Sequence, residues 1–139
     1  EALGMRFDMP SGWLCDLSGG EILLRGSWRN GRAPTINLRW VNTTIDDEVG
    51  QAAYLRSARD EIIEAHGGLL EVSDLSERFF GPHFGAEIEA QSKNTERPSR
   101  TWMVAFCSKR ILTLVLVGPD DATKQSARAL IASLAKGAN

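Results

Sequence analysis

Two stretches near the C-terminal end of the chain predict strands that are apolar on both faces. Residues 111–117, ILTLVLV, are apolar at every position except Thr113. Residues 102–107 alternate between one face with Trp102, Val104 and Phe106 and another with Met103, Ala105 and Cys107. Strands with two apolar faces lie at the centre of a sheet that is covered on both sides. These two runs therefore predict central strands between covering layers.

Period-two patterns predict the other strands of the sheet. Residues 5–13 predict a short strand that enters a turn at Pro10 and Gly12. Residues 21–28 and 35–41 predict an antiparallel pair, because Asn30-Gly31 between them supplies the positive φ angles of a hairpin turn. Residues 69–75 and 84–90 fit two more strands. The polar stretch 92–100 then predicts an exposed hairpin loop.

Two helices are expected to pack on this sheet. The first is predicted from about Thr44 to His66, with a hydroxyl cap and three carboxylates in its first turn. Its apolar stripe comprises Val49, Ala52, Leu55, Ala58, Ile62, Ile63 and Ala65. The second is predicted to begin at Pro119 and to reach Ala135, with a buried stripe made of Ala127, Leu130, Ile131 and Leu134.

These elements predict an α+β protein in which helices pack against a sheet. Its mostly antiparallel, twisted sheet has about six or seven strands and is packed by two long helices. The 139 residues, with 42% apolar and 24% charged side chains, are typical of one globular domain, so residues 1–139 are expected to form a single domain.

Recognisable catalytic, cofactor-binding and metal-binding motifs are absent from the sequence. His66 and His83 are the only histidines, and neither lies in a metal-binding or nucleophile motif. Asp46, Asp47 and Glu48 are consecutive at a predicted helix start, where they point in different directions and complement the helix dipole. We therefore expect no catalytic residues, no cofactor and no metal.

Charge and hydropathy exclude two classes of partner. The net charge of −2 comes from 16 basic and 18 acidic residues spread along the chain, which does not favour nucleic acid. The longest apolar run is far too short to span a bilayer. A basic group around the late hairpin, comprising Lys93, Arg97, Arg100, Lys109 and Arg110, is interpreted as a solvated edge.

The two cysteines, Cys15 and Cys107, lack the spacing of a metal site or a redox motif, and buried free thiols are the default interpretation. A single bridge between them stays open if the protein is exported. The chain starts at Glu1 without an apolar leader, so we expect a processed or trimmed form. The bacterial cytoplasm and an exported location both stay open.

The segment FFGPHFG, residues 79–85, is the candidate binding site. Phe79, Phe80 and Phe84 flank a Gly-Pro turn together with His83, and part of this apolar area is expected to be exposed. Because a few aromatic anchors dominate interfaces, these four residues form a candidate protein contact surface, with Phe80 as its centre. The alternative is that the rings are core residues beside a tight turn.

The order of elements resembles the PsbP-like superfamily. The resemblance rests on Pro10, Gly12 and Trp13, on Gly85 entering a strand, and on residues 131–134, IASL, in the last helix. That superfamily includes photosystem accessory proteins, a Ran-binding import factor, bacterial lipoproteins and Eag-type secretion chaperones. The resemblance implies an α/β/α sandwich and a binding function, and it provides no site residues.

The leading functional hypothesis is therefore a non-catalytic domain that binds another protein, as an adaptor, accessory factor or secretion-type chaperone. The alternative is an exported domain that binds a small molecule or lipid in a pocket between sheet and helix. A third hypothesis is an enzyme that uses His83 with a distant carboxylate. The partner and the oligomeric state are left open.

Overall fold

The structure, a computed structural model, describes residues 5–6, 14–18, 21–25, 35–66, 70–92, 99–107, 109–118, 121–133 and 135–136. Its main sheet contains eight strands: β2 (Leu14–Ser18), β3 (Glu21–Arg25), β4 (Thr35–Asn42), β5 (Leu70–Val72), β6 (Ser76–Phe80), β7 (His83–Ser92), β8 (Arg100–Cys107) and β9 (Arg110–Val117). The two helices are α1 (Glu48–His66) and α2 (Asp121–Ala132). A separate short pair joins β1 (Met5–Arg6) to β10 (Ala135–Lys136).

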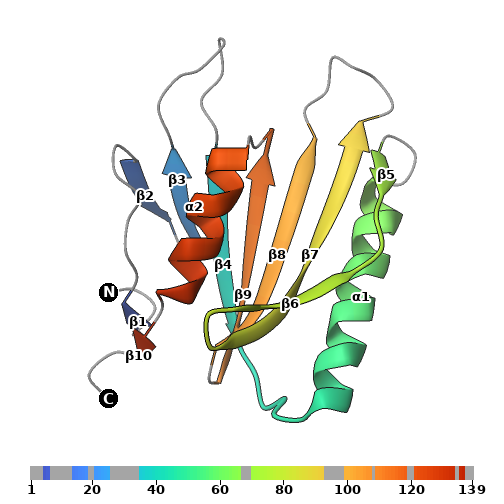
Figure 1. Cartoon of the computed structure of the whole chain (residues 1–139), viewed down its shortest axis with the longest axis vertical. Coiled ribbons are helices and arrows are strands. Elements are labelled where there is room, and N and C mark those ends of the chain that lie inside the picture. Colours follow the sequence, from blue (N-terminus) through green and yellow to red (C-terminus); the bar gives the residue numbers. More distant parts are fainter. Residues whose placement is uncertain are drawn as a thin grey trace.

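The main sheet is antiparallel at every described pairing, in the order β2-β3-β4-β9-β8-β7-β5. Strand β6 also pairs with β7, beside the start of β7, while β5 pairs with its end. The predicted α+β class and the mostly antiparallel sheet are thus confirmed (Figure 1). Six of the predicted runs lie in the main sheet, as β3, β4, β5, β7, β8 and β9, and the unpredicted strands β2 and β6 bring the number to eight.

One face of the sheet packs against α2. Buried Ala127, Leu130 and Ile131 of α2 share a core cluster with apolar residues of the central strands: Ile36, Leu38, Met103, Ala105, Cys107, Leu112, Leu114 and Leu116. The predicted stripe of the last helix is confirmed at these three positions, whereas Leu134 and Pro119 lie outside the described residues. Figure 1 shows α2 crossing in front of the sheet.

The opposite face of the sheet packs against α1. Leu55 of α1 contacts a cluster with Ala86, Val104, Phe106 and Ile111, and Ile62 belongs to a second cluster with Ile88, Ala90 and Trp102. Strand β8 is buried from Thr101 to Cys107, because alternate residues face α1 and α2. The prediction of central strands covered on both faces is confirmed, and with it the three-layer α/β/α arrangement.

The helices differ from the prediction in length and start. Helix α1 has 19 residues but α2 has 12, so only α1 is long. Helix α1 begins at Glu48 and not at Thr44, because the Asp47 carboxylate accepts a hydrogen bond from the Gly50 amide at 2.7 Å, as an N-cap. The Thr43 hydroxyl instead accepts from the Ile45 amide. Three residues of the predicted stripe are exposed: Val49, Ile63 and Ala65.

The free-thiol interpretation is confirmed for Cys107, which is buried in the core and unbridged. Cys15 lies on β2, which is separated from β8 by β3, β4 and β9. Neighbouring strands are about 4.8 Å apart, so the two backbones are much farther apart than a disulfide allows. The hairpin turn at Asn30-Gly31 lies outside the described residues.

Two glycines shape the hairpin of β6 and β7. Gly81 has a φ of 61° at the first position of a two-residue turn, where a hairpin requires positive φ. A side chain there would also meet Ala132 at the end of α2, at 3.0 Å. At Gly85, a Cβ atom would collide with the Val104 carbonyl oxygen of β8. Both glycines permit close packing, which holds the hairpin against α2 and β8.

Candidate functional site

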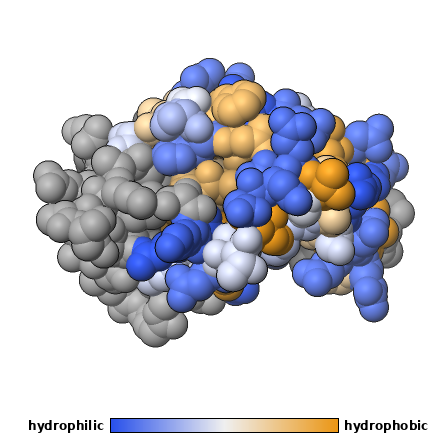
Figure 2. Space-filling view, turned by 90° about the horizontal axis from the view of Figure 1, so that it is seen from below, coloured by the Kyte–Doolittle hydropathy of each residue, from blue (hydrophilic) through white to orange (hydrophobic). Residues whose placement is uncertain are grey.

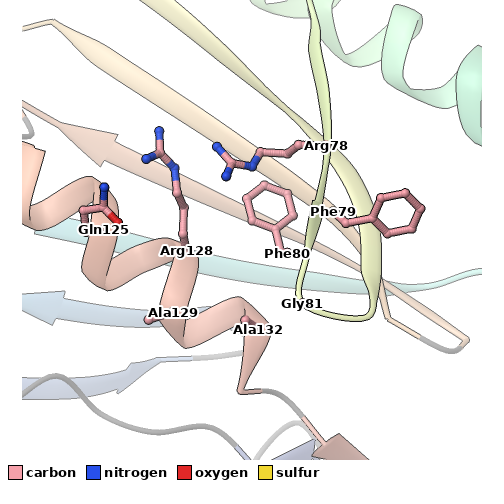
Figure 3. Close-up of a pocket in the computed structure, with 8 residues that line it drawn as sticks. All are labelled: Arg78, Phe79, Phe80, Gly81, Gln125, Arg128, Ala129 and Ala132. Atoms are coloured by element: carbon pink, nitrogen blue, oxygen red, sulfur yellow. The ribbon is translucent and has the colours of Figure 1, made fainter.

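The β6–β7 hairpin places two neighbouring phenylalanines on opposite faces of the sheet. Phe79 is 66% exposed, whereas Phe80 is 2% exposed and belongs to the core cluster under α2. Figure 3 shows the two rings on opposite sides of β6. The expectation that Phe80 is the exposed centre of a contact surface is therefore wrong, because side chains alternate along a strand and position 80 faces the core.

Phe79 instead ends a series of aromatic rings that contact one another. Its ring contacts Phe84 edge to face, with centroids 5.4 Å apart. Phe84 is half-buried and stacks on Phe106 at 6.4 Å, and Phe106 contacts Tyr54 of α1 edge to face at 5.9 Å. These contacts extend from the core to the surface. The exposed ring of Phe79 is thus held by a rigid aromatic base.

The same end of the sheet carries further exposed apolar side chains. Val41, which is exposed, pairs with Ile111, and Ile111 pairs with Phe106 in the next strand. Together with Phe84 and Phe79 these residues form an apolar row across the sheet. Val49, in the first turn of α1, is also exposed. Figure 2 views the molecule from the side where α1 begins and shows apolar atoms gathered between hydrophilic ones.

On the other side of the hairpin, a pocket of about 330 Å³ lies between β6 and α2 (Figure 3). Its lining consists of Arg78, Phe79, Phe80, Gly81, Gln125, Arg128, Ala129 and Ala132. The two arginines are the only charged side chains in this lining. The pocket therefore combines an apolar wall with a positively charged one.

The guanidinium groups of the pocket are held by one buried carboxylate. Glu87 of β7 is buried and accepts two hydrogen bonds from Arg128, from Nε at 2.6 Å and from Nη2 at 2.9 Å. Arg78 donates a third through Nη1 at 2.9 Å. The hydrogen bond to Glu87 is the main cause that raises the pKa of Arg128 above its ordinary value. This bidentate geometry fixes the orientation of Arg128.

Phe80 supports the second arginine. The Arg78 Cζ atom lies 5.5 Å from the centroid of the Phe80 ring, in a cation–π contact. The Arg78 Nε atom is buried and has no hydrogen-bond partner within the described part of the chain. About one turn before Arg128 on α2, Lys124 pairs with Glu89 at 3.2 Å. The positive wall is therefore built by packing and by ion pairs together.

His83 begins β7, pairs with Phe80 across the hairpin and is half-buried. Within the described ranges, no three residues among His, Cys, Asp and Glu come together as a metal site. Burial raises the pKa of the Cys107 thiol to about 12, which disfavours the reactive thiolate. None of the helices in the described ranges is long and apolar enough to cross a membrane.

The basic group predicted around the late hairpin does not come together as a whole. Arg100 pairs with Val117 at one end of β9, while Arg110 pairs with Cys107 at the other end. Lys109 directly precedes Arg110, so both lie at the end of the sheet opposite to Arg100. Lys93 and Arg97 lie outside the described residues.

Sequence reasoning missed Arg78, Glu87 and Arg128. Glu87 follows the alternation of β7, opposite to Ala86 and Ile88, and such a position is usually interpreted as solvent-facing. Arg128 lies one residue after Ala127 of the buried stripe. A signal in the sequence is that one strand carries acidic residues and a later helix carries basic ones. This signal can be interpreted only when the topology shows that the helix covers that strand.

Neither a family model nor a curated protein matches this chain. Three solved structures resemble it in fold. LpqN, involved in cell envelope biogenesis of Mycobacterium tuberculosis, is 15% identical with a TM-score of 0.63, over 91% of this chain and 79% of LpqN. PsbP (CyanoP) from Synechocystis sp. PCC 6803 is 15% identical with a TM-score of 0.61, over 96% of this chain and 86% of that one. The chain has a PsbP-like fold.

The third structure is a protein from Bacteroides thetaiotaomicron, 12% identical with a TM-score of 0.63 over 97% of this chain. This chain spans 46% of the length of that protein. The resemblance to the PsbP-like superfamily that the sequence suggested is confirmed at the level of the fold. At such identities the likeness concerns architecture, and the residues of the hairpin have to be interpreted from their own chemistry.

Proposed function

We propose that this PsbP-like domain is a non-catalytic module that binds another protein through the end of the sheet formed by Phe79 and its apolar row. The observation that carries the proposal is the exposure of Phe79. A phenylalanine that is 66% exposed on a structured hairpin leaves a large apolar area in water. Burial of that area by a partner is favourable.

The rigidity of the hairpin supports this function. Interfaces draw most of their energy from a few aromatic or arginine anchors, and an anchor that is already ordered costs little entropy on binding. Phe79 rests on Phe84, and the turn at Gly81 packs against α2. Phe79 and Phe84 therefore stay in the proposed contact surface, whereas Phe80 and His83, which pair across the hairpin, lie on the side of α2.

The test is capture of a partner by the immobilised domain from a lysate of its native host, quantified by mass spectrometry. Phe79→Ser is expected to reduce capture of a specific protein at least tenfold, because an exposed anchor is lost while the core is kept. A matched control is Ile63→Ser, another exposed apolar residue, located in the last turn of α1. Equal capture by the wild type and by Phe79→Ser would refute the proposal.

The alternative of a small-molecule or lipid ligand is favoured by one observation, the pocket between β6 and α2. Its volume of about 330 Å³ lies at the lower limit for ligand sites. Two guanidinium groups in its wall disfavour an acyl chain, because charged groups would face apolar carbon. Native mass spectrometry of the purified protein would reveal a retained small molecule, the result that this alternative requires.

A further inference from the structure

The pocket between β6 and α2 has an uneven charge balance. Arg78 and Arg128 share one carboxylate, that of Glu87, so the three side chains together carry one net positive charge. The neighbouring Lys124 and Glu89 compensate each other. Asp121 lies two turns before Arg128 on α2 and is exposed, so solvent and salt screen its charge. The excess of positive charge is located at the pocket wall.

Both guanidinium groups remain accessible while they hold Glu87. The side chains of Arg78 and Arg128 are 39% and 25% exposed, whereas that of Glu87 is only 6% exposed. Arg128 donates hydrogen bonds to Glu87 from two nitrogens, and Arg78 donates from one. Figure 3 shows the Arg78 head group next to the Phe80 ring and the Arg128 head group beyond it, on the same side of β6. An incoming group therefore meets guanidinium N–H donors and not the carboxylate beneath them.

We infer that this pocket is a carboxylate-binding subsite, which receives an Asp or Glu side chain of the partner protein. Guanidinium groups recognise carboxylates through paired, charge-assisted hydrogen bonds. Phe80, Ala129 and Ala132 provide apolar contact for the methylene groups of such a side chain. This assignment rests on the proposed function, since the partner that covers Phe79 carries the acidic residue across the edge of β6.

The placement of the two sites supports a single partner. Phe79 and Phe80 are consecutive, so the exposed ring and the charged pocket lie on the two sides of one edge strand. A segment that passes over this edge contacts an apolar anchor on one side and two guanidinium groups on the other. These two contacts together favour a partner segment that has an acidic residue close to an apolar one.

The test is nuclear magnetic resonance titration of the full 139-residue chain with N-acetyl-glutamate amide. Backbone amides of Arg78, Gly81 and Arg128 are expected to shift, with a dissociation constant of about 10 mM, as for two charge-assisted hydrogen bonds. N-acetyl-glutamine amide, at the same concentration and ionic strength, lacks the negative charge and is expected to leave these amides unchanged. Equal responses to the two compounds, or no response to either, would overturn the inference.

A variant that keeps the ion pairs of Glu87 intact strengthens the test. Gln125 is an exposed residue of the pocket lining, so Gln125→Glu adds a negative charge without changing the core. It is expected to weaken binding of N-acetyl-glutamate amide at least about fivefold, through repulsion at short distance. Ala53→Glu, at an exposed position of α1, makes the same charge change away from the pocket and is expected to have no effect. Equal weakening in both variants would contradict a local site.

The two proposals fail in different ways. If Phe79→Ser abolishes partner capture but the amides do not respond to N-acetyl-glutamate amide, the carboxylate subsite is wrong and the proposed function stands. If the amides respond but Phe79→Ser captures the partner normally, the proposed function is wrong. The assignment of the carboxylate to a partner then fails as well.

Discussion

Replacement of Phe80 and of Phe79 by alanine provides a direct test of how the β6–β7 hairpin is oriented. The two residues are identical and consecutive, yet one is 2% exposed and the other 66% exposed. The same substitution therefore removes core packing at one position and mostly solvated surface at the other. Phe80→Ala is expected to destabilise the protein far more than Phe79→Ala.

The magnitudes follow from burial. Phe80 is almost fully buried between the sheet and α2, and such Phe→Ala changes cost about 3 to 5 kcal/mol. Phe79 buries only about a third of its surface, worth roughly 0.5 to 1 kcal/mol of transfer energy. Loss of its contact with Phe84 adds up to about 1 kcal/mol.

Urea denaturation followed by circular dichroism measures both free energies of unfolding, and thermal melts provide a second readout. With about 2.1 cal/mol/K of unfolding entropy per residue, the 139 residues give about 0.29 kcal/mol/K, so 1 kcal/mol lowers the melting temperature by roughly 3 °C. Phe80→Ala is expected to lower it by about 10 to 17 °C. Equal losses in the two variants, or a larger loss for Phe79→Ala, would refute the orientation of the hairpin.

Three further predictions concern the packing and the ion pairs around this hairpin. Gly85→Ala is expected to lower the free energy of unfolding in urea by at least about 2 kcal/mol, because the new Cβ atom meets the backbone of β8, which cannot move aside easily. A decrease of less than about 0.5 kcal/mol would contradict the close approach of Gly85 to β8. Glu87→Ala is expected to cost about 2 to 4 kcal/mol, since it leaves two guanidinium groups without their carboxylate. Glu89→Ala, which removes a more exposed pair, should cost less than about 1 kcal/mol, and similar losses for both would argue against a special role of Glu87. For Cys107, burial raises the pKa of the thiol from 9.0 to about 12. As the pH rises, the thiol therefore loses its proton in the unfolded chain before it does so in the folded one. The stabilisation that is present below about pH 9 is lost as the pH rises toward 12. Stability of the wild type should therefore fall more steeply than that of Cys107→Ala between pH 9 and 11, and parallel curves would show that this thiol does not contribute.

The layers of the fold were predictable because they depend on local alternation. Trp102 and Met103 start two opposite apolar faces, and the structure places α1 over the first and α2 over the second. Strand β6, Ser76–Phe80, was not predicted, since three polar residues followed by two phenylalanines show no alternation. Its strand conformation comes from pairing with β7, which the sequence of the segment does not encode.

The candidate site was predictable in its location but not in its orientation. The cluster FFGPHFG marks the hairpin correctly, because aromatic rings beside a Gly-Pro turn are unusual for a loop. Which of Phe79 and Phe80 faces water depends on the register with β7, and a shift of one residue exchanges the two faces. The sequence provides the composition of this surface, whereas the pairing decides which ring is exposed.

The ion pairs of Glu87 suggest why a charged residue is buried near this edge of the sheet. Glu87 faces α2 at a position where an apolar residue would pack at lower cost, since buried ion pairs are often no more stable than apolar replacements. A leucine there would leave Arg78 and Arg128 without a carboxylate to orient them. The bidentate pair with Arg128 and the single hydrogen bond from Arg78 instead direct both guanidinium groups to the pocket while α2 stays docked. The polar interior of this edge is therefore better explained by the positioning of two arginines at the surface than by stability.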